Sequence, residues 1–166
     1  MSQPLVLVSI AEQRLRLITG SRIVMDVAVS TARKGVGERR GSEQTPRGWH
    51  QIRACIGANR PPNTVFVGRR PTGEVYSPAL RASHPQRDWI LTRILWLSGL
   101  EIGRNRLSEV DTMARYIYIH GCPEESPMGI PGSHGCIRMR NDEIIELFQQ
   151  VQAGTRVNIT EAPTTE

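Results

Sequence analysis

Short β-type segments separated by turns dominate this chain of 166 residues. Three of them occupy 5–10, 14–18 and 23–30, where apolar residues alternate with polar ones or are β-branched, with only turn-sized breaks between them. Consecutive strands with short connections form an antiparallel meander. Clear helical spacing of apolar residues occurs only late in the chain, beginning after Asn141 as the N-cap and ending at Gly154. The pattern predicts a mostly β fold with one C-terminal α-helix.

The rest of the chain fits a single domain over residues 1–160, because 39% hydrophobic residues suffice for an ordinary core at this length. Residues 57–85 are rich in proline and predict an irregular excursion. The apolar segment 89–97 predicts a central strand, in which Arg93 either faces solvent or meets an acid. The tail, 161–166, is expected to be disordered. Further strands are expected at 49–56 and 156–160.

Two His-x-Cys pairs, His120-Gly-Cys122 and His134-Gly-Cys136, fall within seventeen consecutive residues. A cysteine attacks as its thiolate and has a pKa of roughly 8.5, so it needs a base at neutral pH. The aromatic and β-branched run 115–119 predicts a strand that ends at His120, and a loop rich in Pro and Gly then leads back to Cys136. The motif therefore predicts a nucleophilic cysteine beside a histidine.

The same motif resembles the active-site signature of the L,D-transpeptidase (YkuD-like) catalytic domain family. The resemblance rests on His120-Gly121 and on Ser133-His-Gly-Cys-Ile-Arg-Met139, and it extends to Thr45-Pro-Arg-Gly48 near the start and Gly154-Thr-Arg-Val157 near the end. It is less clear over 59–87. The resemblance implies a single-domain β-sandwich of the L,D-transpeptidase type. Cys122 departs from the family pattern, in which a small hydroxyl residue is more usual.

The resemblance also implies the roles of individual residues. Cys136 is expected to be the acylated nucleophile, His120 the base, and Gly135 a glycine whose N–H, with that of Cys136, forms the oxyanion hole. Ser133, His134 and Arg138 are expected from the resemblance to line the substrate groove. Tyr118 and Arg104 are further expected substrate-binding residues, Arg104 because its charge suits the terminal carboxylate of the substrate. Family enzymes act on peptidoglycan stem peptides at the bond between diaminopimelate and D-alanine, use no cofactor, and are inhibited covalently by carbapenems.

Several of these residues keep a second interpretation. His134 either binds substrate or holds the turn, and Arg138 either binds a substrate carboxylate or pairs with an acid such as Glu143. Cys122 is interpreted as a packing residue. A different class of site, a tetrahedral zinc bound by both His-x-Cys pairs, is the remote alternative.

The acceptor that resolves the acyl-enzyme is either water or an amine. The N-terminal segment lacks a basic start followed by an apolar run, and a nucleophilic thiol must stay reduced, so we expect a cytoplasmic protein, with a periplasmic one as the alternative. A cytoplasmic member of the family would meet recycled tetrapeptides, which favours an L,D-carboxypeptidase of murein recycling. The alternative is an L,D-transpeptidase that forms 3-3 cross-links in the cell wall.

Charge and hydropathy exclude other classes of partner. The net charge is +5, and 20 of the 21 basic residues are arginine, which suits carboxylate ligands as well as an ordinary solvated surface. These arginines are scattered along the chain and are not grouped with aromatic residues, so no nucleic-acid partner is predicted. No apolar run has transmembrane length, and no membrane partner is predicted.

Overall fold

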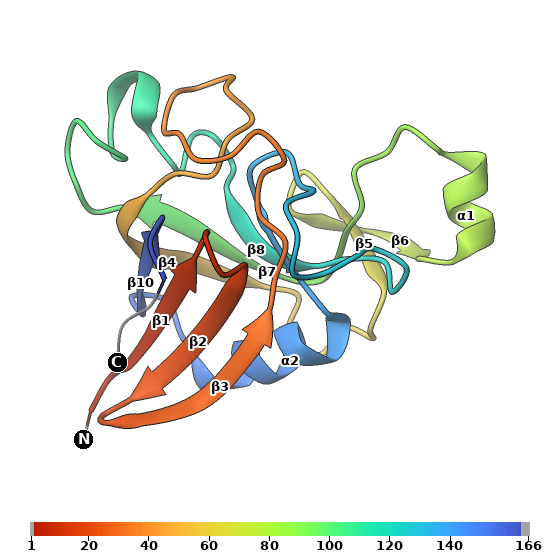
Figure 1. Cartoon of the computed structure of the whole chain (residues 1–166). Helices are drawn as coiled ribbons and strands as arrows, with labels where there is room; N and C mark the ends of the chain where they lie inside the picture. Colours follow the sequence, from red (N-terminus) through yellow and green to blue (C-terminus); the bar gives the residue numbers. More distant parts are fainter. Residues whose placement is uncertain (1, 164–166) are drawn as a thin grey trace.

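A computed structural model describes residues 2–163 of the chain, and within them the backbone forms one strongly curled β-sheet. Figure 1 shows the meander of the first three strands at one side of the molecule and a projecting hairpin and short helix at the other. The strands are β1 (Pro4–Ser9), β2 (Arg14–Thr19), β3 (Arg22–Ala28), β4 (Gly48–Ile56), β5 (Thr64–Val67), β6 (Arg70–Val75), β7 (Ile90–Gly99), β8 (Tyr118–Gly121), β9 (Ile137–Met139) and β10 (Arg156–Thr160). The helices are α1 (Pro78–Ser83), the 3-10 turn η1 (Ser108–Val110) and α2 (Asn141–Gln150).

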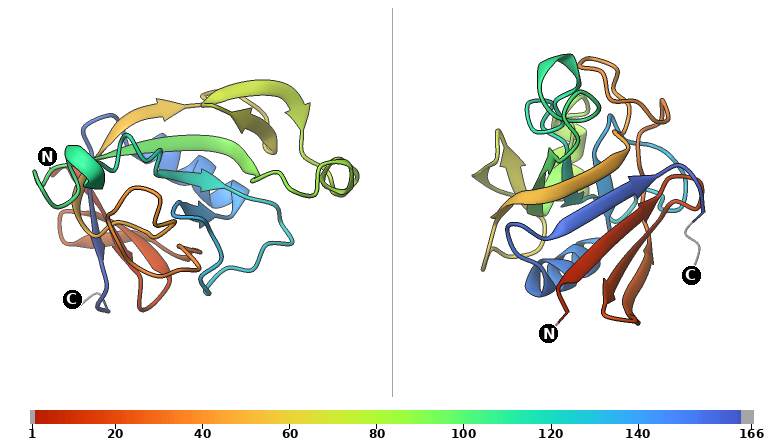
Figure 2. Two further views of the ribbon diagram at one scale, coloured as in Figure 1. Left: turned by 90° about the horizontal axis from the view of Figure 1, so that it is seen from above. Right: turned by 90° about the vertical axis from the view of Figure 1, so that its left-hand side faces the viewer.

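The strand order explains how the sheet curls. Along the main path the order is β3-β2-β1-β10-β4-β7-β5-β6, and β8 and β9 continue from β7 as a second branch. The predicted meander of β1, β2 and β3 is confirmed, and the last strand, β10, inserts parallel to β1 and antiparallel to β4. The segment after β3 then meets β9, since Ser30 and Arg138 exchange backbone hydrogen bonds of 3.0 and 2.9 Å. The sheet therefore rolls almost onto itself, as the two views of Figure 2 show.

The core lies inside this rolled sheet. Inward-facing residues of alternating position on the strands, such as Val6, Val8, Leu15 and Leu17, are fully buried, as period-two patterning requires. Helix α2 contacts β7 and β8 and contributes Ile144 and Leu147 to the same cluster. The mostly β fold with one C-terminal helix is thus confirmed, and α1 and η1 are short additions that the sequence analysis missed.

The bounds of α2 differ from the prediction at both ends. Arg140 is the N-cap, and Asn141 is the first helical residue. The Asn141 side chain is buried and accepts a hydrogen bond of 2.6 Å from Thr92 while donating one of 3.0 Å to the Cys122 carbonyl. Asn141 therefore joins α2 to the strands instead of capping it. The helix ends at Gln150, four residues before Gly154.

Arg93 follows neither of its predicted alternatives. Its side chain is buried, and its guanidinium donates to the carbonyls of Arg60 and Thr92 at 2.8 and 2.7 Å. It also lies over the Phe148 ring of α2, with 5.4 Å between the guanidinium carbon and the ring centre. The side chain thus joins the loop before β5 to α2, and no acidic side chain of residues 2–163 pairs with it.

The end of the chain is held to the sheet further than predicted. The Ala11 N–H donates to the Glu161 carbonyl at 2.9 Å, and the Ser9 hydroxyl donates to the Ala162 carbonyl at 2.9 Å. Residues 161 and 162 are thus hydrogen-bonded to the end of β1 and the turn after it, the disorder of the tail stays a prediction, and 164–166 lie outside the described residues. Over residues 2–163, no helix is long and apolar enough to cross a membrane.

Candidate active site

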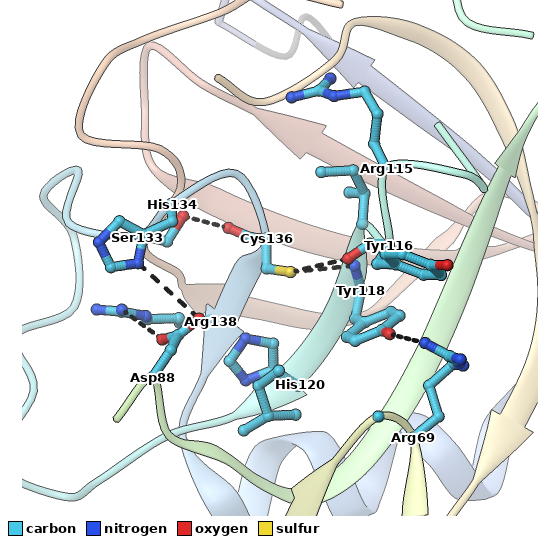
Figure 3. Close-up of a pocket in the computed structure, with 13 residues that line it drawn as sticks. Arg69, Asp88, Arg115, Tyr116, Tyr118, His120, Ser133, His134, Cys136 and Arg138 are labelled. Atoms are coloured by element: carbon cyan, nitrogen blue, oxygen red, sulfur yellow. Dashed lines mark hydrogen bonds and ion pairs between the residues drawn. The ribbon is translucent and has the colours of Figure 1, made fainter. Parts of the chain in front are cut away.

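A cavity of about 470 Å³ opens between β8, the loop before β9 and the turn that joins β5 to β6. Figure 3 shows Cys136 and His120 facing the same cavity, with Tyr118, Arg115 and Arg69 on one side and Asp88, Arg138 and His134 on the other. Of the residues predicted from the sequence motif, Ser133 also lines this cavity. The fold therefore brings the two halves of the motif together, as predicted.

The sulfur of Cys136 lies at the start of β9, against the backbone of the strand-forming segment 116–118. It accepts a hydrogen bond from the Tyr118 N–H at 3.3 Å and donates its own to the Tyr116 carbonyl at 3.6 Å. Its side chain also packs against the cluster of Phe66, Ile94 and Tyr118. Burial raises the pKa of the Cys136 thiol from 9.0 to about 12, so the resting side chain is a neutral thiol.

His120 is buried in β8 and is held in one tautomer. Its Nδ1 lies 2.5 Å from the Gly121 carbonyl oxygen. A carbonyl can only accept, so Nδ1 carries the proton and Nε2 keeps a free lone pair. Burial lowers the pKa of His120, which keeps the imidazole neutral. The cavity thus holds a neutral thiol and a neutral imidazole whose Nε2 can accept a proton.

The turn before Cys136 is fixed by hydroxyl groups. Gly135 has φ of +132°, and a Cβ there would lie 3.1 Å from the Ile117 side chain, so this position requires glycine. The Thr45 hydroxyl donates to the Gly135 carbonyl at 2.9 Å and accepts from the Ala32 N–H at 3.0 Å. The Ser133 hydroxyl donates to the Cys136 carbonyl at 2.6 Å.

These contacts change the expected oxyanion site. The Gly135 N–H already donates to the Ser133 hydroxyl at 3.1 Å, whereas the Cys136 N–H has no partner within residues 2–163. Because a trans peptide places C=O and N–H on opposite sides, Thr45 fixes the direction of the Cys136 N–H when it holds the Gly135 carbonyl. In this arrangement the Cys136 N–H is the free donor, and Gly135 and Ser133 shape the turn.

One acidic residue serves both His134 and Arg138. Asp88 lies 3.4 Å from the Arg138 guanidinium and 3.9 Å from Nδ1 of His134. Arg138 therefore pairs with Asp88 and not with Glu143, the acid expected from the sequence, although it still lines the cavity. His134 is more than half exposed at the rim.

Among the five predicted substrate-binding residues, Arg104 is the one that does not line the cavity. It lies in the loop after β7 and pairs with Glu101 at 3.3 Å. Sequence reasoning missed Arg69, Asp88 and Arg115, which do line the cavity. Arg115 stood at the start of a predicted strand and offered some signal, but nothing in the sequence indicated the other two.

The zinc alternative is not supported by the placement of its four ligands. Cys122 is buried, and its thiol donates to the Met139 carbonyl at 3.2 Å. Burial raises the pKa of Cys122 to about 11, as expected for a packing residue. In the part of the chain that the structure describes, no three His, Cys, Asp or Glu side chains are placed to hold a metal ion.

Comparison with known proteins shows the family to which the chain belongs. Residues 3–159 match the family model of the L,D-transpeptidase catalytic domain. YqjB of Bacillus subtilis, whose name assigns it provisionally to the L,D-transpeptidases, is 50% identical over 50 residues, which are 30% of this chain and 28% of YqjB. The chain therefore matches well under two thirds of this relative.

Solved structures show the same fold. L,D-transpeptidase 3 from Mycobacterium tuberculosis, in complex with a faropenem-derived adduct, superposes with a TM-score of 0.59 at 14% identity over 96% of this chain and 61% of that one. The LD transpeptidase LdtMt1 in complex with imipenem gives 0.58 at 16% identity, over 95% and 59%. At such low sequence identity these comparisons show the fold alone, and they confirm the mostly β architecture predicted from the sequence.

Proposed function

Because this chain belongs to the L,D-transpeptidase catalytic domain family, we propose that it is a cysteine acyltransferase of peptidoglycan stem peptides. The observation that carries the proposal is the cavity shared by Cys136 and His120, with Nδ1 of His120 fixed on the Gly121 carbonyl. A thiol and an imidazole with a free Nε2 are the groups that nucleophilic acyl transfer needs.

The reaction follows from these groups. As the Cys136 sulfur attacks the carbonyl carbon of the third residue, Nε2 of His120 takes the thiol proton, and the Cys136 N–H donates to the oxyanion. Collapse of this intermediate breaks the amide bond, and His120 returns the proton to the departing amine of D-alanine. The product is a thioester on Cys136. In deacylation, His120 takes a proton from the acceptor as the acceptor forms a bond to the thioester carbonyl carbon. The C–S bond then breaks, and His120 returns the proton to the sulfur, which regenerates the thiol.

We propose water as the acceptor, which makes the protein an L,D-carboxypeptidase. The cavity is lined by the guanidinium groups of Arg69, Arg115 and Arg138 and by one carboxylate, Asp88, which already pairs with Arg138. An acceptor amine of a second stem peptide is an ammonium ion at neutral pH, and like charges disfavour its entry. Water is neutral, so this lining does not repel it. The alternative is transpeptidation, in which an amine does reach the thioester.

The acceptor is tested with a diaminopimelate tetrapeptide supplied together with a second stem peptide. Mass spectrometry is expected to show tripeptide and free D-alanine, with no product from the Cys136→Ala variant. A dominant cross-linked dimer would establish the transpeptidase alternative, and an unchanged tetrapeptide would contradict acyl transfer on this substrate. The proposed setting is recycling in the cytoplasm, and fractionation of cells that produce the protein is expected to find it there.

We also propose that carbapenems acylate Cys136, since the M. tuberculosis relative carries a faropenem-derived adduct and LdtMt1 was solved with imipenem. Incubation with imipenem is expected to raise the mass of the protein by one drug molecule. The Cys136→Ala variant is expected to stay unmodified, whereas Cys122→Ala, which removes the buried packing thiol, is expected to react like the original chain. Modification at any other residue would contradict the assignment.

A further inference from the structure

Arg69 places a positive charge at the cavity without an acidic partner. It sits at the turn between β5 and β6, and its guanidinium lies 4.9 Å from the Trp96 ring centre and 4.6 Å from that of Tyr116. Its polar partner is the Tyr118 hydroxyl, to which it donates at 3.0 Å. Within residues 2–163, no carboxylate lies at ion-pair distance from Arg69. A guanidinium has five N–H donors, so most of those of Arg69 remain available.

The other two arginines of the cavity are already engaged. Arg115 donates to the Gly37 carbonyl at 3.2 Å and to the Gln44 carbonyl at 2.6 Å, so it supports the loop between β3 and β4. Arg138 pairs with Asp88. A ligand carboxylate would have to compete with these partners at either residue. Of the three arginines, Arg69 is the one whose guanidinium neither pairs with a carboxylate nor donates to a backbone carbonyl among residues 2–163.

The backbone at Arg69 is also unusual. Gly68 and Arg69 have φ of +57° and +66°, so both central residues of the hairpin turn are in the left-handed region. Turns of this kind favour Gly, Asn or Asp, and a long side chain there is uncommon. An observed outlier of this kind is a reason to look for function. Here the turn carries a long cation to the cavity, where its guanidinium lies close to the rings of Trp96 and Tyr116. Figure 3 shows its bond to the Tyr118 hydroxyl.

Tyr118 links this cation to the nucleophile. Its backbone N–H contacts the Cys136 sulfur at 3.3 Å, and its ring extends from there to Arg69. The Tyr118 hydroxyl accepts from Arg69, and no acceptor for its own proton occurs among the described residues. The Arg69 N–H groups and the Tyr118 O–H are therefore two donors at one place, and the Tyr118 residue joins that place to the sulfur.

We infer that Arg69 and the Tyr118 hydroxyl form the subsite for the free α-carboxylate of the leaving D-amino acid. This inference rests on the proposed function, but it concerns the leaving group and holds whether water or an amine resolves the thioester. The carboxylate of a terminal residue lies about 3.8 Å, one residue spacing, beyond the scissile bond, which matches a subsite next to the nucleophile. The subsite selects chain ends over internal bonds, because an internal residue has no such carboxylate.

Binding to the Cys136→Ala chain tests the subsite without turnover. Calorimetry compares a tetrapeptide that ends in D-alanine with the same peptide ending in D-alaninamide. Arg69→Asn removes the cation but supplies a residue that suits the left-handed turn, so the hairpin is expected to keep its stability. The peptide with the free acid is expected to bind this variant about tenfold to a hundredfold more weakly than it binds the Cys136→Ala parent. The amide is expected to bind both about equally well, so that the preference for the acid is lost. Tyr118→Phe is expected to cause a smaller loss in the same direction.

Arg53→Gln is the matched control. Arg53 lies over the same Trp96 ring, at 5.5 Å, but does not line the cavity, so its loss removes one charge and one ring contact from the neighbourhood. Both peptides are expected to bind this variant as they bind the parent. Arg69→Lys keeps the charge and is expected to restore part of the preference for the acid.

Three outcomes would overturn the inference. An equal loss of acid and amide in Arg69→Asn would give Arg69 a structural role, and unchanged binding of the acid would give it none. Collapse of the preference in Arg138→Gln and not in Arg69→Asn would assign the carboxylate to Arg138. The acceptor assay stays independent, since a cross-linked product would contradict the hydrolytic function and leave the measured acid preference, and with it the subsite, in place.

Discussion

Replacement of Thr45 by valine is expected to disturb the turn that carries Cys136 without changing the cavity lining. Thr45 is fully buried and contacts this turn, and it does not line the cavity. Thr45→Val keeps the shape of the side chain and removes its hydroxyl. The Gly135 carbonyl then loses its donor at 2.9 Å, and the Ala32 N–H loses its acceptor at 3.0 Å. The Gly135–Cys136 peptide is freed to rotate, and the Cys136 N–H loses its fixed direction.

The size of the effect follows from the two groups left unpaired. A buried donor or acceptor without a partner costs about 1–3 kcal/mol, so the free energy of unfolding is expected to fall by about 2–6 kcal/mol for the two groups. At about 2–4 °C per kcal/mol for a chain of this size, Tm is expected to fall by roughly 4–24 °C. Loss of an oxyanion donor costs about 10²–10³ in kcat. The Cys136 N–H is misdirected in this variant and not removed, so kcat is expected to fall by about tenfold to a hundredfold.

The assay combines thermal unfolding with D-alanine release at a temperature where the variant is folded. Thr45→Ser, which retains the hydroxyl and loses one methyl group, is the control and is expected to stay near the parent in kcat. KM is expected to change little in either variant, since Thr45 does not line the cavity. A Thr45→Val chain that is less stable but has the parent kcat would refute the coupling between Thr45 and the Cys136 N–H.

Further predictions concern the thiols and the buried histidines. Cys136→Ala is expected to abolish D-alanine release without loss of fold, while Cys122→Ala keeps most of the activity; the reverse result would exchange their roles. His120→Gln is expected to slow acylation by about a hundredfold or more, and stopped-flow release of D-alanine at the parent rate would contradict its role as base. Burial between the Gly48 carbonyl and the Thr112 hydroxyl lowers the pKa of His50 from 6.5 to about 4. As the pH falls, the unfolded chain therefore binds a proton at His50 before the folded chain does. The contribution of neutral His50 to the free energy of unfolding is fully present above pH 6.5, and about 3 kcal/mol of it is lost by pH 4. Urea unfolding of His50→Gln is expected to show lower stability at pH 7 but a flatter decline over this range.

The sequence predicted those parts of the fold that depend on local pattern. The three-strand meander and α2 have alternating or helical spacing, and each lies in the predicted part of the chain, although the ends of α2 differ. Asn141 shows the limit of such reasoning, since an asparagine before a helix is a good cap by local propensity. Here Thr92 and the Cys122 carbonyl, distant in sequence, bind its side chain and draw it into the core. The prediction for Arg93 was wrong for the same reason. Its partners are backbone carbonyls, which the positions of charged residues in the sequence do not indicate.

The site divides in a similar way. Cys136 and His120 were predicted from a short motif, and they line one cavity because adjacent strands carry them: His120 pairs with Arg138, two residues after Cys136. Arg104 was predicted to bind substrate from its charge alone, but its loop lies away from the cavity and the side chain pairs with Glu101. Which arginine faces the cavity depends on how β5 and β6 fold against β7, a long-range arrangement that composition does not contain.

The residues that make and break bonds and the residues that recognise the end of the substrate differ in how well a family resemblance can assign them. Groups that make and break bonds must meet one geometry, so a motif that resembles a family's signature assigns Cys136 and His120 together. Recognition of the end of the substrate has no such constraint, because a carboxylate can be reached by an arginine from any nearby element. The resemblance by itself favours Arg138, which belongs to the motif, but Asp88 offsets its charge. Arg69 lies instead in 59–87, where the resemblance is weakest, and on a turn whose backbone favours another kind of residue. Substrate selection in this chain is therefore expected to follow the β5–β6 hairpin, so that exchanging this turn would alter the choice of substrate end while leaving the acylation chemistry at Cys136 in place.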